Sequence, residues 1–87
     1  MRDWWVYIIE SEKDKFYTGI TTDISRRFQE HSSGSRGAKY FRTDRPKKVV
    51  LRERYANRSQ ASIRESEIKK LSHKEKLSLI KRHKALG

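Results

Sequence analysis

The stretch WWVYIIESEKDKFYTGI, residues 4–20, decides the fold, because it holds two short apolar runs separated by a polar turn. Residues 4–9 form a continuous aromatic and β-branched run that is too short for an ordinary helix, which indicates a buried strand. Residues 11–14 are polar and predict a turn. Residues 15–20 then supply the second strand of a hairpin, in which Gly19 indicates a bulge or a close approach of the backbone to another group.

The segment after this hairpin predicts a helix followed by a long basic loop. Thr22 or Asp23 can cap the first amide groups of a helix that ends at residues 32–34. From residue 32 to residue 48 the chain is rich in Gly, Ser, Arg and Lys and contains its only proline, Pro46. We therefore expect a loop over residues 32–48.

The remainder of the chain predicts one more strand and two helices. Residues 49–55 are expected to form the strand. Asn57 or Ser59 caps the second helix. The third helix begins at Ser72, where Glu75 completes the Ser-X-X-Glu pattern of a capping box.

The order of these elements is β-β-α-β-α-α, which predicts an α+β fold with a three-stranded, mainly antiparallel sheet flanked by helices. In the second helix, an imperfect stripe that should face the sheet comprises Ala61, Ile63, Ile68 and Leu71, with Arg64 as an optional member. The chain is short enough for one core, so we expect residues 1–87 to form a single domain.

The charge of the chain points to a polyanionic partner. There are 22 Lys and Arg against 11 Asp and Glu, a net charge of +11. Such a surplus favours nucleic acid, with an anionic membrane second, although a soluble protein can simply be basic. The expected nucleic-acid contacts are Arg26, Arg36, Lys39, Arg42, Arg45, Lys47 and Lys48. A second basic face near the C-terminus comprises Lys69, Lys70, Lys74, Lys76, Lys81, Arg82 and Lys84.

Other classes of protein are disfavoured by what the sequence contains. No stretch approaches the ~20 apolar residues of a membrane span, and no secretion signal is recognisable. Without cysteine there is no disulfide and no thiolate zinc site. We expect a cytoplasmic protein, a monomer more readily than an oligomer, that contacts no membrane.

The first helix carries an unusual stripe. Ile24, Arg27, Phe28 and His31 follow the i, i+3, i+4, i+7 spacing of a face that packs on a core. Because buried charge needs a partner, the two basic members either line a cleft that awaits an anion or tilt outward to solvent. The sequence leaves both arrangements open.

The two tyrosines of the hairpin, Tyr7 and Tyr17, also allow two interpretations. A tyrosine on a strand usually packs, with its hydroxyl reaching water or a backbone group. Two of them beside an Arg/His helix can instead place both hydroxyls near a bound phosphate. They share a face only if the hairpin loop has an odd number of residues or carries a bulge.

Together these residues resemble the GIY-YIG nucleases, in particular the small stand-alone bacterial members. Residues 5–7 and 17–19 resemble the two tripeptides of the family name, although Trp5 stands where the name has Gly. Residues 19–31 resemble the segment with the family's Arg and His, and residues 61–71 the helix with its metal-binding carboxylate. The resemblance extends from about residue 4 to about residue 80.

The resemblance implies a metal-dependent endonuclease that hydrolyses phosphodiester bonds, in DNA ahead of RNA. Because contacts with phosphates do not read sequence, we expect recognition that is non-specific or that depends on nucleic-acid structure. It implies five catalytic residues: Tyr7, Tyr17, Arg27, His31 and Glu65. Tyr7 would take a proton from the attacking water, helped by the charge of Arg27, and His31 would accept or relay that proton. Tyr17 would position the water or the phosphate.

Glu65 would hold one divalent cation, Mg²⁺ or Mn²⁺, and no small-molecule cofactor is implied. The alternative for Glu65 is an ordinary surface ion pair with a nearby Arg or Lys. The sequence also departs from many family nucleases in having no asparagine after Asn57. This departure keeps open a catalytically weak or inactive nucleic-acid-binding module on the same fold, and, third, a module that binds an acidic protein.

Overall fold

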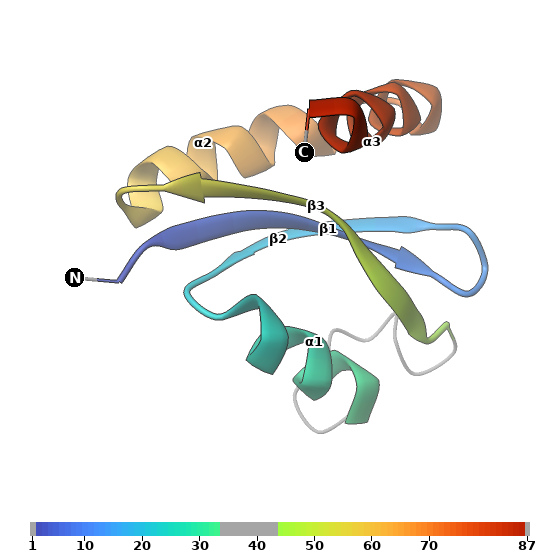
Figure 1. Ribbon diagram of the computed structural model, residues 1–87, viewed down its shortest axis with the longest axis horizontal. Coiled ribbons are helices and arrows are strands. Elements are labelled where there is room, and N and C mark those ends of the chain that lie inside the picture. The colour runs from blue at the N-terminus through green and yellow to red at the C-terminus, as the bar shows by residue number, and fades with distance from the viewer. Residues whose placement is uncertain (1, 34–43, 87) are drawn as a thin grey trace.

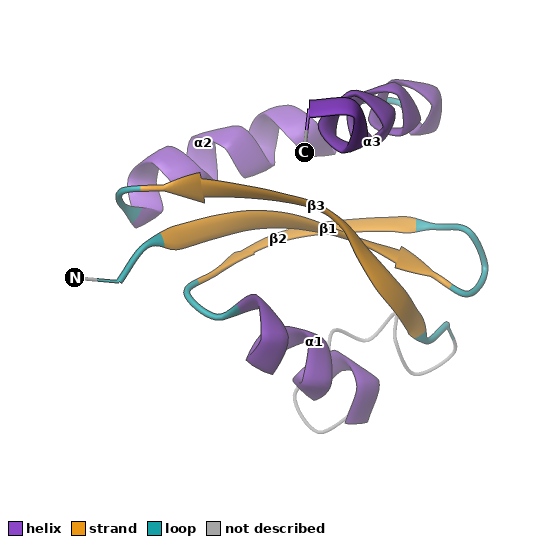
Figure 2. Cartoon of the chain, viewed as in Figure 1, coloured by secondary structure: helices purple, strands orange, loops and turns teal. Residues whose placement is uncertain are grey.

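The computed structural model describes residues 2–33 and 44–86 of the chain (Figure 1). Within these ranges the elements are β1 (Trp4–Ser11), β2 (Phe16–Thr21), α1 (Ile24–Ser33), β3 (Pro46–Tyr55), α2 (Arg58–Lys69) and α3 (His73–Leu86). The described strands form an antiparallel sheet in the order β2-β1-β3. Figure 2 shows α1 on one face of this sheet and α2 with α3 on the other. The predicted α+β fold and its β-β-α-β-α-α order are confirmed.

Strand β1 lies in the middle of the sheet and is buried on both faces. Successive side chains of a strand point to opposite sides. Val6 and Ile8 join the core beneath α2 and α3, whereas Tyr7 and Ile9 pack on the side of α1. The continuous apolar run in the sequence therefore serves two cores, as expected for a strand that is covered on both sides.

The turn between β1 and β2 sets the register of the hairpin. Ser11 N donates to the carbonyl of Lys15 at 2.9 Å, and Asp14, with φ of 62°, donates its N–H to the carbonyl of Ser11 at 3.0 Å. Three residues therefore separate Ser11 from Lys15, and an odd loop is the condition for the two tyrosines to share a face. Tyr7 pairs with Gly19, and Tyr17 pairs with Ile9, so the tyrosines are diagonal neighbours on the α1 face.

Helix α1 continues to Ser33 and strand β3 begins at Pro46, so the predicted loop over residues 32–48 was wrong for its first two and its last three residues; positions 34–43 lie outside the described residues. β1 continues to Ser11, and Ser11 pairs with Pro46. Register shifts between Ile8 and Ile9 and between Glu10 and Ser11 absorb the extra residues of β3. A proline is tolerated at the first position of an edge strand. In the sequence, a proline followed by two lysines indicates a loop. The strand with which these residues pair, β1, is distant in the chain, so no local pattern reveals the pairing.

Each of the three helices within the described residues begins at a side-chain cap. Asp23 and Asn57 each accept a hydrogen bond from the amide three residues further on, at 3.0 and 2.9 Å. Ser72 and Glu75 form the reciprocal bonds of the predicted capping box, at 2.8 and 3.1 Å. No helix in the described parts of the chain is long and apolar enough to cross a membrane.

Helix α2 packs through fewer residues than its sequence stripe suggested. Ala61 and Ile68 are buried, but Ile63 is 62% exposed, so its predicted place on the packing face was wrong. Ile63 lies about 200° around the helix from Ala61. The rotation of α2 is fixed by Arg64, whose Nε and Nη2 bind both carboxylate oxygens of Glu53 on β3 at 2.9 and 3.3 Å.

The contact between Tyr7 and Gly19 generates a stability prediction. A Cβ added at Gly19 would lie 2.5 Å from the hydroxyl oxygen of Tyr7 and 2.7 Å from its ring. Gly19→Ala should therefore lower the free energy of unfolding by about 1–3 kcal/mol, measured by urea denaturation. In a Tyr7→Ala background the same substitution should cost much less. Equal costs in both backgrounds would contradict this contact.

Candidate active site

An open cleft of about 710 Å³ runs along edge strand β2. Because β2 is at the edge of the sheet, side chains from both layers of helices reach the cleft. Five of its lining residues are the predicted catalytic set: Tyr7, Tyr17, Arg27, His31 and Glu65. The fold thus brings together residues from β1, β2, α1 and α2 that are far apart in the sequence.

Tyr7 occupies the inner end of this site. Its side chain lies against Gly19 on β2, and the residue is only 5% exposed. The absence of a side chain on Gly19 is what gives the phenol its room, which accounts for the close backbone approach expected there. The Tyr7 hydroxyl lies 3.5 Å from Nε2 of His31, at the long limit of a hydrogen bond.

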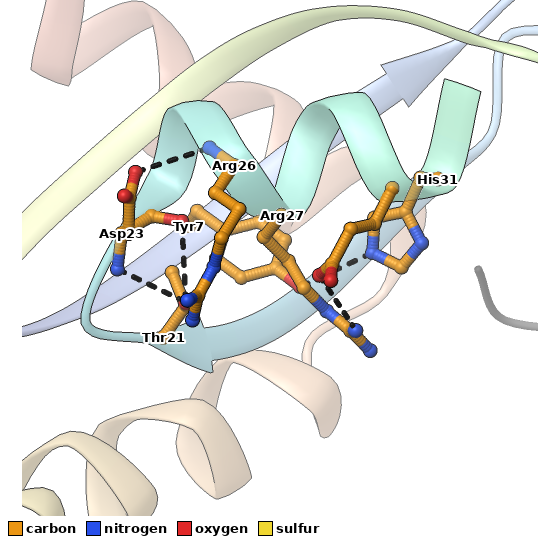
Figure 3. A network of polar contacts seen from close by, with 7 residues as sticks. Tyr7, Thr21, Asp23, Arg26, Arg27 and His31 are labelled. Carbon is orange, nitrogen blue, oxygen red and sulfur yellow. Dashed lines mark hydrogen bonds and ion pairs between the residues drawn. The ribbon is translucent and has the colours of Figure 1, made fainter. Parts of the chain in front are cut away.

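Helix α1 presents Arg27 and His31, four residues apart and therefore on one side of the helix. Figure 3 shows both side chains beside Tyr7. His31 is 3% exposed, which rules out the alternative that it tilts into solvent. Arg27 is partly exposed, and its Nη1 lies 3.5 Å from Oε1 of Glu30. The start of α1 is fixed by the loop before it, where Thr21 Oγ1 accepts from the amide of Asp23 at 3.1 Å.

Burial shifts the proton affinities of this pair in opposite directions. It raises the pKa of Tyr7 above 10, while the hydrogen bond and charge of Arg27 oppose the rise. Burial also lowers the pKa of His31 below 6.5, and the charge of Arg27 lowers it further. Arg27 thus acts on the pKa of Tyr7 in the expected direction, but desolvation is the larger effect and the pKa is raised on balance. At neutral pH a protonated phenol faces a neutral imidazole.

Glu65 projects into the cleft from α2. Its side chain is 23% exposed, and Oε2 lies 3.3 Å from Nζ of Lys69. Its neighbour Glu67 is 60% exposed, pairs with Arg64 and is not among the residues that line the cleft. Glu65 therefore makes the surface ion pair of the simpler interpretation and also faces the site.

The donors in the cleft suit a cation that the substrate helps to bind. Within residues 2–33 and 44–86, no group of three or more His, Cys, Asp or Glu side chains is placed to hold a metal. Mg²⁺ is commonly held by one or two carboxylates, with waters and substrate phosphates filling the other positions. Two carboxylates line the cleft: Glu30, which is paired with Arg27, and Glu65. Glu65 fits this kind of site.

The predicted nucleic-acid contacts are divided by the fold. Arg26 lines the cleft. Lys47 and Lys48 lie on β3, at the opposite edge of the sheet, where Lys48 is 3.9 Å from Glu10. Arg45 precedes β3 and does not line the cleft either. The other three predicted positions, Arg36, Lys39 and Arg42, are outside the described residues.

Three further cations line the cleft from the side of α2 and α3: Arg58, Lys69 and Lys76. Arg58 had not been singled out in the sequence. Its neighbour Asn57 marks the start of a helix, but no local feature of the sequence indicates which side chains in the first turn will lie near β2. The two lysines belong to the predicted basic C-terminal face. No local feature of the sequence distinguishes these two, which line the cleft, from the other members of that face.

This arrangement agrees with comparisons to known proteins. Residues 3–78 match the GIY-YIG catalytic domain, and the chain belongs to the GIY-YIG family. It is 49% identical over 78 residues to a UPF0213 protein of Desulfotalea psychrophila, covering 90% of this chain and 71% of the relative. A UPF0213 protein of Syntrophus aciditrophicus is 47% identical over 79 residues, 91% of each chain. The resemblance seen in the sequence is confirmed.

A solved structure shares the fold. The solution NMR structure of a UPF0213 protein from Bacillus halodurans is 38% identical and has a TM-score of 0.58. The match covers 91% of this chain and 83% of that protein.

The proton affinity of His31 gives a prediction that needs no substrate. An NMR titration of its imidazole should give a pKa below 6.5. Because the folded-state pKa lies below the unfolded value, His31 also contributes stability above pH ~6.5 that is lost as the pH falls through the folded pKa. Arg27→Gln should raise the pKa of His31, whereas Arg26→Gln, an equal loss of charge on the same helix, should change it little. A wild-type pKa at or above 6.5 would refute the assignment.

Proposed function

We propose that this protein is a metal-dependent endonuclease that hydrolyses phosphodiester bonds, in DNA ahead of RNA. One observation carries the proposal: a single cleft holds a buried Tyr–His pair, an arginine and a carboxylate. Phosphodiester hydrolysis needs a proton acceptor for water, charge to neutralise the phosphate and help for the leaving oxygen. The net charge of +11 supports a polyanionic substrate.

The proton path runs from water to Tyr7 and on to His31. Because burial raises the pKa of Tyr7, a free phenolate is costly. The Tyr7 oxygen therefore takes a proton from the attacking water as its own proton passes to Nε2 of His31. The water oxygen forms a bond to phosphorus, and the bond from phosphorus to the leaving oxygen breaks. Neutral His31 is the acceptor that this transfer requires, and its lowered pKa keeps it neutral.

Two other residues position the phosphate. Arg27 can hold a non-bridging oxygen with two parallel N–H donors, which neutralises charge that grows during the reaction. Tyr17 lies on the same face of the sheet as Tyr7, two residues along β2 from Gly19, the residue that pairs with Tyr7. From there its hydroxyl can orient the water or the phosphate. Arg26, on the exposed side of α1, adds a further cation at the rim of the cleft.

Glu65 would hold the divalent cation, Mg²⁺ or Mn²⁺. When bound there, the cation supplies Lewis-acid stabilisation of negative charge on the leaving oxygen. Within the described residues no group of three or more metal-ligating side chains supports Glu65, so binding of the cation should depend on the nucleic acid being present.

A nucleic-acid-binding module with little catalysis is the second candidate. The raised pKa of Tyr7 and the lack of any asparagine after Asn57 favour it. Salt-sensitive binding without a metal-dependent product would identify this function.

The role of Glu65 can be tested by cleavage of labelled single-stranded, duplex and branched DNA, and of RNA, with Mg²⁺ or Mn²⁺. Glu65→Gln should lower the cleavage rate roughly 100-fold or more, a typical loss for a charge-stabilising group. Glu67→Gln, two residues away and exposed, is the matched control and should cleave normally. Chelator should abolish the product. Equal activity of the two variants would remove Glu65 from the mechanism.

The proton path also predicts a pH dependence. Only neutral His31 accepts a proton, so kcat/KM should fall on the acid side as His31 becomes protonated. Because the pKa of His31 is lowered, this decline should begin below pH ~6.5. Measuring kcat/KM against pH at constant metal checks the point. An acid limb centred well above pH ~6.5 would be inconsistent with His31 as the acceptor.

A further inference from the structure

The cleft has a second charged flank that the proposed chemistry leaves unused. Tyr7 and His31 lie on the α1 side of the sheet, whereas Arg58 and Lys76 come from the helices on the other side. All four line the same cleft, which passes around edge strand β2. A strand of nucleic acid in the cleft would therefore meet cations on both sides of β2.

Arg58 is held in place by two local interactions. It is the first residue of α2, directly after the Asn57 cap, so its backbone is fixed. Its guanidinium lies 5.6 Å from the centre of the Trp4 ring. A guanidinium stacked on an aromatic ring keeps its N–H groups at its edge, where they can donate to phosphate oxygens. Arg58 is exposed, so an incoming strand can reach it.

Lys76 is held by the docking of α3 against β2. The ring of His73 stacks on Phe16 of β2, with centroids 4.7 Å apart and planes at 14°. Lys76 lies three residues beyond His73, on the same side of the helix, and so faces the cleft that Phe16 also lines. The stack therefore sets the position of Lys76.

Lys76 differs from Lys69 in its partners. Lys69 is paired with Glu65 at 3.3 Å. Lys76 is half-buried, and among the described residues no carboxylate forms an ion pair with it. Lys76 therefore offers a positive charge that an anion in the cleft can meet directly.

We infer that Arg58 and Lys76 form a second phosphate subsite, which binds a backbone phosphate flanking the one held beside Tyr7 and Arg27. The inference rests on the proposed function in taking nucleic acid as the ligand of the cleft. It makes the substrate a polynucleotide strand that crosses the edge of the sheet, with phosphates bound on both sides of β2. Contacts of this kind set the position of the strand without reading its sequence.

The test measures binding in chelator, so that no turnover is needed. Arg58→Ala, Lys76→Ala and the double variant are compared with Lys70→Ala and Lys81→Ala, which remove equal charge from exposed positions of the same helical layer outside the cleft. The probe is a short fluorescein-labelled single-stranded DNA, titrated at several salt concentrations. Circular dichroism confirms that each variant is folded.

Each subsite variant should weaken binding by about tenfold, the loss expected for one charge-assisted hydrogen bond. The slope of log K against log salt should become shallower by about 0.7 for each lost contact with a single strand. Lys76→Arg should restore most of the affinity and the slope, because the positive charge is retained. The Lys70 and Lys81 controls should change both quantities much less.

The outcomes separate the subsite from the enzyme. Variants of Arg58 and Lys76 that bind like the controls would overturn the subsite, whether or not the wild type cleaves DNA. Binding that depends on both residues, in a protein that gives no product with Mg²⁺ or Mn²⁺, would support the subsite and reject the proposed hydrolysis. Weakened binding with an unchanged salt slope would also overturn the subsite, because a structural effect and not a lost phosphate contact would then explain it.

Discussion

The contact of the Tyr7 side chain with Gly19 determines where the site can be. Any side chain larger than hydrogen at position 19 would occupy the space of the phenol. With glycine there, the hydroxyl of a residue on the central strand reaches the edge of the sheet. There it meets His31 from one helical layer and comes under the electrostatic influence of Glu65 from the other. The three-residue turn after β1 supplies the register on which this contact depends.

The burial that closes the inner end of the cleft also sets its chemistry. Removing a phenol and an imidazole from water disfavours the charged form of each, so the pKa of Tyr7 rises and that of His31 falls. Both groups are then neutral at physiological pH. The phenol can donate a proton, and the imidazole can accept one. The charges of the site are carried by its more exposed members, Arg27 and Glu65, where solvent and neighbouring ions partly compensate them.

Edge strand β2 separates two groups of basic residues with different surroundings. On the α1 side, Arg27 is beside Glu30 and the buried pair. On the other side, Arg58 is held by Trp4, and Lys76 is held indirectly by the stack of Phe16 on His73. These aromatic contacts give two long, flexible side chains defined positions at the cleft. The basic residues of β3 are excluded from it because β1 lies between the two edge strands.

The sequence by itself determined the elements and their order, and its local patterns singled out Tyr7, Tyr17, Arg27 and His31 while leaving their arrangement open. Strand runs, helix caps and the Arg27–His31 spacing are local features, governed by backbone periodicity and by hydrogen bonds within one turn. The odd loop length that places both tyrosines on one face is equally local. The catalytic roles of all five residues came from the resemblance to a family, and Glu65 was not marked by any property of its own helix.

Only the tertiary structure decided which side chains are buried and which cationic side chains line the same cleft. It placed His31 in the interior, left Ile63 in solvent, extended β3 to Pro46 and brought Arg58 to the cleft. Each of these outcomes depends on the partner that a segment finds across the sheet. The same is true of the pKa of Tyr7, where the desolvation that outweighs Arg27 is produced by residues distant in the chain. Such partners are set by packing over long separations, which periodicity and capping do not encode.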